Sequence, residues 1–366
     1  MRASRSWSAD MTANASIKWL RRNLFSSWWN GALTLFVLYV FWSTIPPFLD
    51  WALVRAVWSG EGREACLGPD KGACWPFIFA NLDQFIYGRY PTELRWRVDL
   101  AFLLGLAGLV PMLIPRVPAK LWNLGYLVVA WPMIAIVLIA GDRPGLVGVD
   151  TDLWGGLLVT LVVAITGIVA SFPLGILLAL GRRSEMPVIR TLSIMFIEFW
   201  RGVPLVTVLF MASVMLPLFL PQGVRLDNLL RCLVGVALFS SAYMAEVVRG
   251  GLQAVPRGQY EAARALGLSY WQTMGLIVLP QALRSVIPGI VNTFIGLFKD
   301  TTLVLIVGLF DFLGQVRIQL SDMHWATPQG AATGYVFAAL VYWVFCFGMS
   351  RYSVFMEKRL NAGRAR

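Results

Sequence analysis

The sequence contains several apolar runs that are long enough to cross a lipid bilayer. About 20 helical residues cover the hydrocarbon core, and only helices and closed barrels satisfy their backbone hydrogen bonds inside it. Of the 366 residues, 58% are hydrophobic and 14% are charged. Soluble domains usually carry about 25% charged residues. The chain is therefore predicted to be an all-α, polytopic membrane protein.

The lengths of the apolar runs predict about eight membrane-spanning helices. The predicted spans are 29–45, 98–114, 121–140, 156–180, 202–220, 229–248, 284–298 and 334–349. Pro46 and Pro47 are expected to end the first span, because proline disrupts a helix interior. The apolar stretch 301–320 is predicted to be a short, partly re-entrant or surface segment. It is interrupted by Gly308, Asp311 and Gly314.

Lys and Arg in short loops indicate the orientation of the chain, because such loops stay in the cytoplasm. The basic groups are Lys18, Arg21 and Arg22; Arg116 and Lys120; Arg182, Arg183 and Arg190; Arg249, Arg257 and Arg264; and Arg351, Lys358, Arg359, Arg364 and Arg366. The opposite loops are balanced or acidic: Asp142, Asp150 and Asp152 with Arg143, and Asp311 and Asp322 with Arg317. We predict both termini in the cytoplasm and the long loop 50–97 outside. The net charge of +11 then reflects topology, and no nucleic-acid partner is expected.

The N-terminus and the cysteines add little chemistry. The first apolar run is a full span without a small-residue cleavage site, so no cleavable signal peptide is expected. Cys66 and Cys74 share the predicted outer loop, where a disulfide and two free thiols both remain open. Cys232 and Cys346 lie in spans and are interpreted as packing residues. His324 is the only histidine and is interpreted as a loop residue, so no metal site is expected.

The stretch 241–280 is polar, although apolar spans flank it. A membrane helix is predicted to end near Arg249, because the following glycine pair would break it. A short helix from Arg257 to Leu266 would start after a proline and end at Gly267 in a left-handed turn. A second short helix, 269–278, would begin at a serine cap and stop before Pro280. A plain solvated loop is the alternative.

Seven residues in this stretch fit the pattern E-A-A-x3-G-x9-I-x-L-P: Glu261, Ala262, Ala263, Gly267, Ile277, Leu279 and Pro280. The pattern resembles the cytoplasmic EAA loop, about 250–280 here, of permease subunits in binding-protein-dependent ABC importers. That resemblance implies a coupling helix that docks on a separate ATPase. Ala262 and Ala263 would form a small face on it. Apolar anchors of the interface type are available in Tyr260, Leu266, Leu268 and Trp271.

A second motif, IEFWRGVPLVTVLF at 197–210, resembles the E-x-x-R-G-T-P-L pattern of polar amino-acid permeases. The matching residues are Glu198, Arg201, Gly202, Pro204 and Leu205, whereas Val203 replaces the usual threonine. Glu198 and Arg201 are three apart and are expected to pair on one helix face. The pair is either a plain interfacial ion pair or part of the inner gate and translocation path. Glu246 and Arg249 are likewise expected to pair, on a stripe with Tyr243.

A third motif, NTFIGLFKDTTL at 292–303, places charges inside an apolar run. Ionisable residues at membrane depth are functional candidates, so Lys299 and Asp300 are assigned to the substrate pathway. A helix break at Asp300, Thr301 and Thr302 would free backbone N–H groups for a substrate carboxylate. Asn292 would add a hydrogen bond. Alternatively, Lys299 and Asp300 are simple anchors at the outer interface.

Residues 151–366 resemble the polar amino-acid permease core, a five-helix type I (MetI-like) importer fold, from end to end. Residues 1–150 are predicted to be an extension with three spans and a long periplasmic loop. Three segments of the chain resemble the general L-amino-acid importer permeases of Gram-negative bacteria: WLRRNLFSSWWN, ACWPFI and FIYGRYP.

The resemblance implies a set of partners in the bacterial inner membrane. They are an ABC ATPase dimer, a second permease subunit that is a paralogue or a second copy, a periplasmic solute-binding protein, an L-amino-acid substrate and membrane lipid. The chain has no G-x-x-x-x-G-K-[ST] phosphate loop and no catalytic triad. It is therefore expected to be no enzyme and to hold no cofactor, with ATP bound by the partner. The alternative is an ion-coupled secondary transporter or channel, but the inverted repeats typical of that class are not evident. A membrane enzyme is a weaker alternative.

Overall fold

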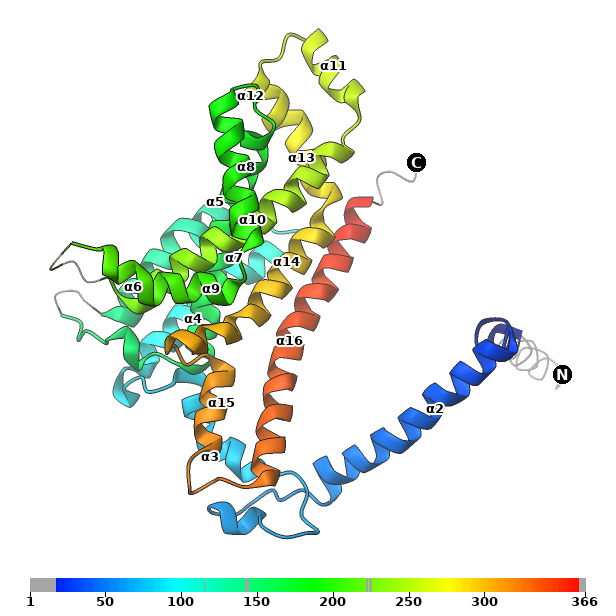
Figure 1. The fold of residues 1–366 in the computed structure, drawn as a ribbon, viewed down its shortest axis with the longest axis vertical. Helices are drawn as coiled ribbons and strands as arrows, with labels where there is room; N and C mark the ends of the chain where they lie inside the picture. The colour runs from blue at the N-terminus through cyan, green and yellow to red at the C-terminus, as the bar shows by residue number, and fades with distance from the viewer. Residues whose placement is uncertain (1–17, 115, 142–144, 222, 224–225, 362–366) are drawn as a thin grey trace, which may run out of the picture. The chain divides into compact units, whose positions relative to one another are not determined.

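The computed structural model describes residues 18–114, 116–141, 145–221, 223 and 226–361, and this part of the chain is helical without a β-strand (Figure 1). The all-α prediction is confirmed. The chain forms two compact units, one from residues 1–77 with 323–333 and one from 78–322 with 334–366. A division near residue 150 stays a prediction. Asp142, Arg143, Arg364 and Arg366 lie outside the described residues.

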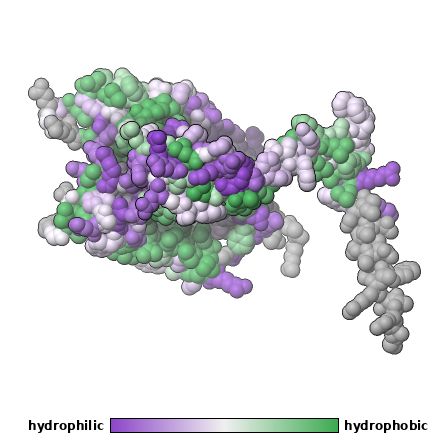
Figure 2. Space-filling view, turned by 90° about the horizontal axis from the view of Figure 1, so that it is seen from below, coloured by the Kyte–Doolittle hydropathy of each residue, from purple (hydrophilic) through white to green (hydrophobic). Residues whose placement is uncertain are grey.

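Within the described chain, seven helical segments are long and apolar enough to cross a membrane. They are Trp28–Val54, Thr92–Leu113, Lys120–Ala140, Gly156–Arg182, Asn228–Ala254, Ile287–Val307 and Pro328–Leu360. A pair of segments, Pro187–Gly202 and Leu205–Phe219, is bent by 102° and would count as an eighth span. The prediction of about eight spans is confirmed. In Figure 2, hydrophobic side chains cover much of the flanks and hydrophilic ones gather between them.

The first unit contains the helix α2 (Trp28–Leu49) and the π-helical η1 (Asp50–Val54). The helix continues past Pro46 and Pro47, so the predicted stop is wrong. The carbonyls of both prolines still accept the Asp50 N–H, and membrane helices tolerate the missing donors. After the 3-10 turn η2 (Arg63–Cys66), a disulfide joins Cys66 to Cys74. The structure thus selects the disulfide from the two states that the sequence left open.

Helices α3 (Trp75–Tyr87) and α16 (Pro328–Asn361) each belong to both units. The second unit starts with η3 (Thr92–Leu94) and α4 (Arg95–Leu113). It continues with α5 (Lys120–Gly125), η4 (Tyr126–Ala130), α6 (Trp131–Ala140), η5 (Thr151–Leu153), α7 (Gly156–Arg182), α8 (Pro187–Gly202), α9 (Leu205–Phe210), η6 (Met211–Met215), η7 (Leu216–Phe219), α10 (Asn228–Ala254), α11 (Arg257–Ala265), α12 (Tyr270–Gln272), η8 (Thr273–Val278), α13 (Leu279–Ser285), α14 (Ile287–Asp300), η9 (Thr301–Val307) and α15 (Phe312–Leu320).

The centre of the second unit is α7, which packs closely against α10 and α14. A Cβ at Gly175 would lie 2.6 Å from Met244 Cγ, and a Cβ at Gly167 would lie 2.7 Å from Leu297 Cδ2. Lipid is as apolar as a helix surface, so membrane helices associate through close packing at small residues. These glycines therefore set the spacing of the helices that carry the candidate site.

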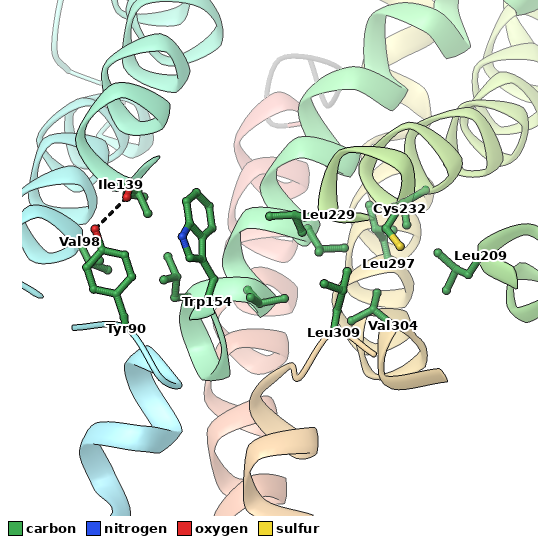
Figure 3. Close-up of a cluster of buried hydrophobic side chains, with 14 of the residues drawn as sticks. Tyr90, Val98, Ile139, Trp154, Leu209, Leu229, Cys232, Leu297, Val304 and Leu309 are labelled. Atoms are coloured by element: carbon green, nitrogen blue, oxygen red, sulfur yellow. Dashed lines mark hydrogen bonds between the residues drawn. The ribbon is translucent and has the colours of Figure 1, made fainter. Parts of the chain in front are cut away.

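A buried apolar cluster joins the helices near the end of the bundle at which α7 begins. Figure 3 shows Trp154 between Tyr90 and Ile139 on one side and Leu229 on the other. The Tyr90 hydroxyl donates to the carbonyl of Ile139 over 2.8 Å. This cluster fixes α4 and α6 against α7 and α10.

The segment after α14 differs in detail from its prediction. The chain passes without a gap from α14 into the 3-10 helix η9 and turns at Gly308, with φ 82°. Asp311 then caps α15, and Gly314 lies inside that helix. The interruptions at Gly308 and Asp311 are confirmed, whereas Gly314 does not interrupt a helix. A break at 300–302 that frees backbone N–H groups is also wrong, because the chain stays helical there.

Candidate functional site

The motif region forms a helical hairpin whose first arm is α11. Pro256 occupies the N-cap, and the helix ends at Gly267, which has φ 71°. The Gly267 N–H donates to Arg264 O over 2.9 Å and the Leu268 N–H to Ala263 O over 3.1 Å. These two bonds form a Schellman motif, which requires the left-handed conformation that glycine adopts without strain. The predicted left-handed turn is confirmed.

The second arm begins at Ser269, which forms a capping box with Gln272. Its helix does not stop before Pro280. It continues through α12, η8 and α13, with Pro280 in the first turn of α13. The helix continues because η8 is π-helical, and the Leu279 N–H donates to Met274 O five residues earlier. The hydrogen-bond register therefore shifts just before Pro280, which has no backbone N–H to donate. The predicted end of this helix is therefore wrong.

Helix α10 does not end at the glycine pair either. It runs through Gly250 and Gly251 to Ala254. A Cβ at Gly251 would lie 2.6 Å from the carbonyl oxygen of Ala282 in α13, whereas a Cβ at Gly250 would meet nothing within 4 Å. Gly251 thus serves close helix packing, and the predicted helix break is wrong.

The motif residues differ in exposure. Ala263 is fully buried, whereas Ala262 is exposed, so the two alanines do not form one docking face. The prediction of a shared face is wrong because consecutive helical residues point about 100° apart. Glu261, Gly267 and Pro280 are exposed, and Ile277 and Leu279 are half-buried.

Large apolar side chains are exposed on this hairpin. Leu266 is 77% exposed, Trp271 70% and Leu276 72%. Tyr260 and Leu268 are only partly exposed. A polar segment outside the candidate spans that presents an aromatic and two leucines has the composition of a protein-binding surface.

The base of the hairpin is tied to the membrane helices by Arg183, the C-cap residue of α7. Its Nη1 donates to the Leu252 carbonyl over 3.1 Å and to the Tyr260 hydroxyl over 3.0 Å. Its guanidinium carbon also lies 5.5 Å from the centre of the Tyr260 ring. Gln281 donates to Gln259 over 3.1 Å and so joins the two arms.

The preceding residue, Arg182, belongs to a charge cluster shared by α7, α8 and α10. Its Nη1 donates to Glu198 Oε1 and Glu246 Oε1, each over 2.9 Å. Arg249 Nη2 lies 2.8 Å from Glu246 Oε2, and Arg201 Nη1 lies 3.6 Å from the same oxygen. The Glu246 side chain is 17% exposed, so three arginines surround one largely buried carboxylate.

The cluster corrects one predicted pairing and confirms another. Glu198 pairs with Arg182 and not with Arg201, because α8 packs against α7 and α10 and turns the two side chains toward different partners. The Glu246–Arg249 pair is confirmed. The sequence did not indicate Arg182 or Arg183 as functional residues. Their tandem position at the end of a span was a weak signal, but their partners lie on other helices.

The third motif presents a different arrangement. Asn292 and Lys299 are exposed, Asp300 is half-buried and Thr301 is buried. The hydroxyls of Thr301 and Thr302 donate to the carbonyls of Phe298 and Lys299 over 2.8 and 3.0 Å. The two hydroxyls are thus engaged by their own helix.

The candidate pathway residues of the second and third motifs lie at different levels along α7. A Cβ at Gly167, near the middle of α7, would lie 2.7 Å from Leu297 Cδ2, which precedes the segment 299–302. Glu198 pairs instead with Arg182 at the end of α7. Arg182 lies 15 residues beyond Gly167, and at ~1.5 Å per residue this is about 22 Å. The structure therefore does not bring Glu198 and Arg201 together with 299–302.

Asp311 forms a buried polar node that the sequence indicated only as an interruption. It is 0% exposed and accepts from the Gly314 N–H over 3.0 Å and from the Tyr342 hydroxyl over 2.9 Å. Burial raises the pKa of its carboxyl, although these hydrogen bonds act in the opposite direction. Asp311 thus fixes the start of α15 against α16. Among the described residues, no group of three potential metal ligands occurs.

Comparison with known proteins gives similar chains over nearly the full length. The inner membrane amino-acid ABC transporter permease protein YhdY of Escherichia coli K12 is 54% identical, with 97% of this chain and 96% of that protein covered. The glutamate/glutamine/aspartate/asparagine transport system permease protein BztC of Rhodobacter capsulatus is 41% identical over 96% and 95%. A crystal structure of an amino acid ABC transporter with histidines is 30% identical over 56% of this chain and 92% of its own, with a TM-score of 0.49.

A family model described as the binding-protein-dependent transport system inner membrane component matches residues 171–362. This range contains the helical hairpin, the charge cluster and the third motif. The match confirms the resemblance drawn from the sequence and the type I importer permease fold. The chain is a multi-pass protein that belongs to the family of inner membrane components of binding-protein-dependent transport systems.

Proposed function

We propose that this chain is the permease subunit of an ABC importer of L-amino acids. The observation that carries the proposal is the helical hairpin of α11, α12 and η8, which exposes Leu266, Trp271 and Leu276 beyond the helix bundle. The two similar proteins from Escherichia coli and Rhodobacter capsulatus, both named as amino-acid permeases, support the substrate class. An ion-coupled transporter would have no need of such a surface.

The proposed assembly contains two permease subunits, two ATPases and a periplasmic solute-binding protein, with ATP held by the ATPases. The hairpin then docks on an ATPase in the cytoplasm, and both termini lie on the same side. The residues assigned to coupling are Glu261, Ala262, Ala263, Gly267, Ile277, Leu279 and Pro280. Gly267 supports the bend, Ala263 packs inward, and the exposed residues meet the partner.

The contacts of Arg182 and Arg183 suggest how docking reaches the membrane helices. A displacement of α11 moves Tyr260, which is bonded to Arg183 over 3.0 Å. The neighbouring Arg182 holds Glu198 and Glu246 on two further helices. ATP-driven movement of the hairpin would therefore shift α7, α8 and α10 together, with Arg201 at the edge of the same cluster.

A docking experiment tests the coupling loop. Gly267→Val imposes a β-branched side chain on φ 71°, which L-residues resist by ~1–2 kcal/mol. We expect weaker ATPase binding and loss of uptake in the reconstituted importer. Gly258→Ala is the matched control, because Gly258 lies inside α11 and a Cβ there meets nothing within 4 Å. Binding-protein-stimulated hydrolysis that stays coupled to uptake in Gly267→Val would refute the assignment.

A second experiment tests the substrate pathway, for which Asn292, Lys299, Asp300, Thr301 and Thr302 are proposed. An amino acid that leaves water needs partners for both of its charges. Lys299→Met and Asp300→Asn should each lower uptake while the complex assembles and basal ATP hydrolysis persists. Wild-type uptake in both variants at normal abundance would identify these residues as interfacial anchors.

Thiol labelling tests the orientation. A membrane-impermeant maleimide should label Cys66 and Cys74 in intact spheroplasts only after reduction, because the two are joined as a disulfide. A cysteine introduced at Ser269 should stay unlabelled until the membrane is opened. Labelling of that cysteine in intact spheroplasts would overturn the proposed topology.

A further inference from the structure

A large cavity in the second unit lies between the helices α4 and α6 and the helices α7 and α10, and has a volume of about 620 Å³. Its walls are almost entirely apolar, with Phe102, Ala135, Ile165, Val169 and Leu233 among the lining side chains. All four helices belong to candidate membrane spans. We call this cavity the inter-helix slot.

We propose that the inter-helix slot binds one acyl chain of a phospholipid whose headgroup carries an ammonium. An apolar slot among membrane-spanning helices offers water no hydrogen-bond partners, so a hydrocarbon chain is the occupant that its chemistry favours.

The dimensions of the slot support this occupant. It follows α10 from Asp227 to Ala237, about 15 Å at ~1.5 Å per residue. That depth equals about half of the ~30 Å hydrocarbon core, which is the thickness of one leaflet. The slot therefore accommodates a chain from the leaflet at the end where α10 begins.

A spanning helix from another protein fits the length of the slot poorly. Such a helix has about 20 residues and a length of ~30 Å. The slot follows α10 only from Asp227 to Ala237, about 15 Å at ~1.5 Å per residue.

The mouth of the slot is polar, unlike its walls. Thr151, Trp154 and Asp227 line it, and the Thr151 hydroxyl donates to the Asp227 carboxylate. Asp227 is exposed and caps α10 through a bond of 2.9 Å from the Leu230 N–H. An exposed carboxylate beside an apolar slot is complementary to a lipid ammonium.

Trp154 provides an independent observation. The residue is 7% exposed, and its indole N–H has no acceptor among the described residues. A buried tryptophan N–H usually finds a partner. An ester carbonyl at the top of an acyl chain would supply the acceptor.

The lipid would lie between elements on either side of residue 151, where the sequence divides into an N-terminal extension and a permease core. The contact between them rests on the cluster of Tyr90, Ile139 and Trp154 at one end. Away from this cluster, the slot lies between α6 and α10. An acyl chain in the slot would fill the space between the N-terminal extension and the permease core.

Native mass spectrometry of the purified importer complex tests the proposal, with phosphatidylethanolamine and phosphatidylglycerol of identical acyl chains as probes. We expect one tightly held phosphatidylethanolamine per copy of this chain, and several-fold weaker retention of phosphatidylglycerol. Ala135→Phe, which fills the slot, should remove that lipid. Ala107→Phe is the matched control, because Ala107 is exposed on α4 and does not line the slot.

The headgroup has its own variant. Asp227→Asn keeps an N-cap residue of equal quality but removes the charge. We expect the lipid to be retained with the preference for ethanolamine over glycerol headgroups reduced several-fold. Equal retention of both lipids by the wild type would overturn the ammonium assignment.

Photolabelling of the unaltered chain tests the slot even if the Ala135→Phe variant does not assemble. A phosphatidylethanolamine with a diazirine in its acyl chain should label peptides that contain 128–140 and 162–170 of the unaltered chain. Retained lipid in Ala135→Phe, or absence of label from both peptides, would refute the slot. Cross-linking of a cysteine at Thr166 to a second permease chain would show that a protein fills it.

Discussion

Arg182 and Glu246 join α7 to α10 through a hydrogen-bonded ion pair of 2.9 Å. The two residues are 64 positions apart in the chain. Glu246 is largely buried and also pairs with Arg249 and Arg201. The same carboxylate therefore holds three helices at the end of the bundle from which the helical hairpin projects.

Glu246→Gln should destabilise the subunit more than Glu198→Gln. Loss of the central carboxylate leaves three arginines without a shared partner, which we expect to cost about 1–3 kcal/mol. Glu198 is 55% exposed and, among the described residues, forms an ion pair only with Arg182, so its replacement should cost less than about 1 kcal/mol. Thermal unfolding of the purified importer and uptake in proteoliposomes measure both. Equal losses in the two variants would contradict the central role of Glu246.

Arg183→Gln and Tyr260→Phe should each lower the ratio of amino acid imported to ATP hydrolysed. Both remove the 3.0 Å hydrogen bond that links α7 to α11, while the hairpin and its exposed surface stay in place. Arg190→Gln, at an exposed position on α8, serves as the control and should leave the ratio unchanged. A ratio equal to that of the wild type in both test variants would exclude this contact from coupling.

Gly251→Ala and Gly250→Ala should act in opposite directions although the residues are neighbours. A methyl at Gly251 would lie 2.6 Å from Ala282 O and 3.0 Å from Val286 Cγ1, and such overpacking costs about 1–3 kcal/mol. A methyl at Gly250 meets nothing within 4 Å and should add up to ~1 kcal/mol of helix stability. Thermal unfolding of each variant decides this. If the Gly251→Ala variant unfolds at the wild-type temperature, α10 and α13 are not in close contact.

Asp311→Asn should change how stability depends on pH. Burial raises the folded-state pKa of Asp311 above the unfolded value of about 3.9. The folded state then binds more protons between these two pKa values, so the contribution of Asp311 is present at low pH and is lost as pH rises through the folded pKa. Asparagine does not titrate, so it removes this pH-dependent contribution to stability, and its side chain can still cap α15.

The stability of Asp311→Asn relative to wild type should therefore improve from pH 4 to pH 7. The measured quantity is the change with pH of the difference in unfolding free energy between variant and wild type. A loss of stability that is equal at all pH values does not alter this change. Unfolding curves collected across this range measure it, and a constant difference would show that Asp311 has the same pKa in both states.

The turn and the cap of the helical hairpin could be predicted from sequence because their signals are local. Gly267 in a left-handed turn follows from the conformational freedom of glycine. The cap at Ser269 follows from the chemistry of a serine side chain facing free N–H groups. The spans follow from length and apolarity alone, which the bilayer imposes on any chain.

The predicted helix ends at prolines and glycines were wrong because each helix has support that lies outside the local sequence pattern. Helix α2 passes Pro46 and Pro47 inside a candidate span, where water does not compete for the backbone. A π-helical segment shifts the hydrogen bonds before Pro280. Helix α10 continues through Gly250 and Gly251, and Gly251 packs closely against α13.

The sequence by itself determined the all-α class, the approximate number of spans, the membrane class and the family, because apolar length and a fixed motif are properties of adjacent residues. Only the tertiary structure decided which charges pair, that Ala263 turns inward, and that Glu198 and the segment 299–302 lie at different levels along α7. Those facts depend on which helix faces which. Helix packing in lipid is set by the fit of small residues such as Gly167 and Gly175 against their neighbours, and no single segment encodes that fit.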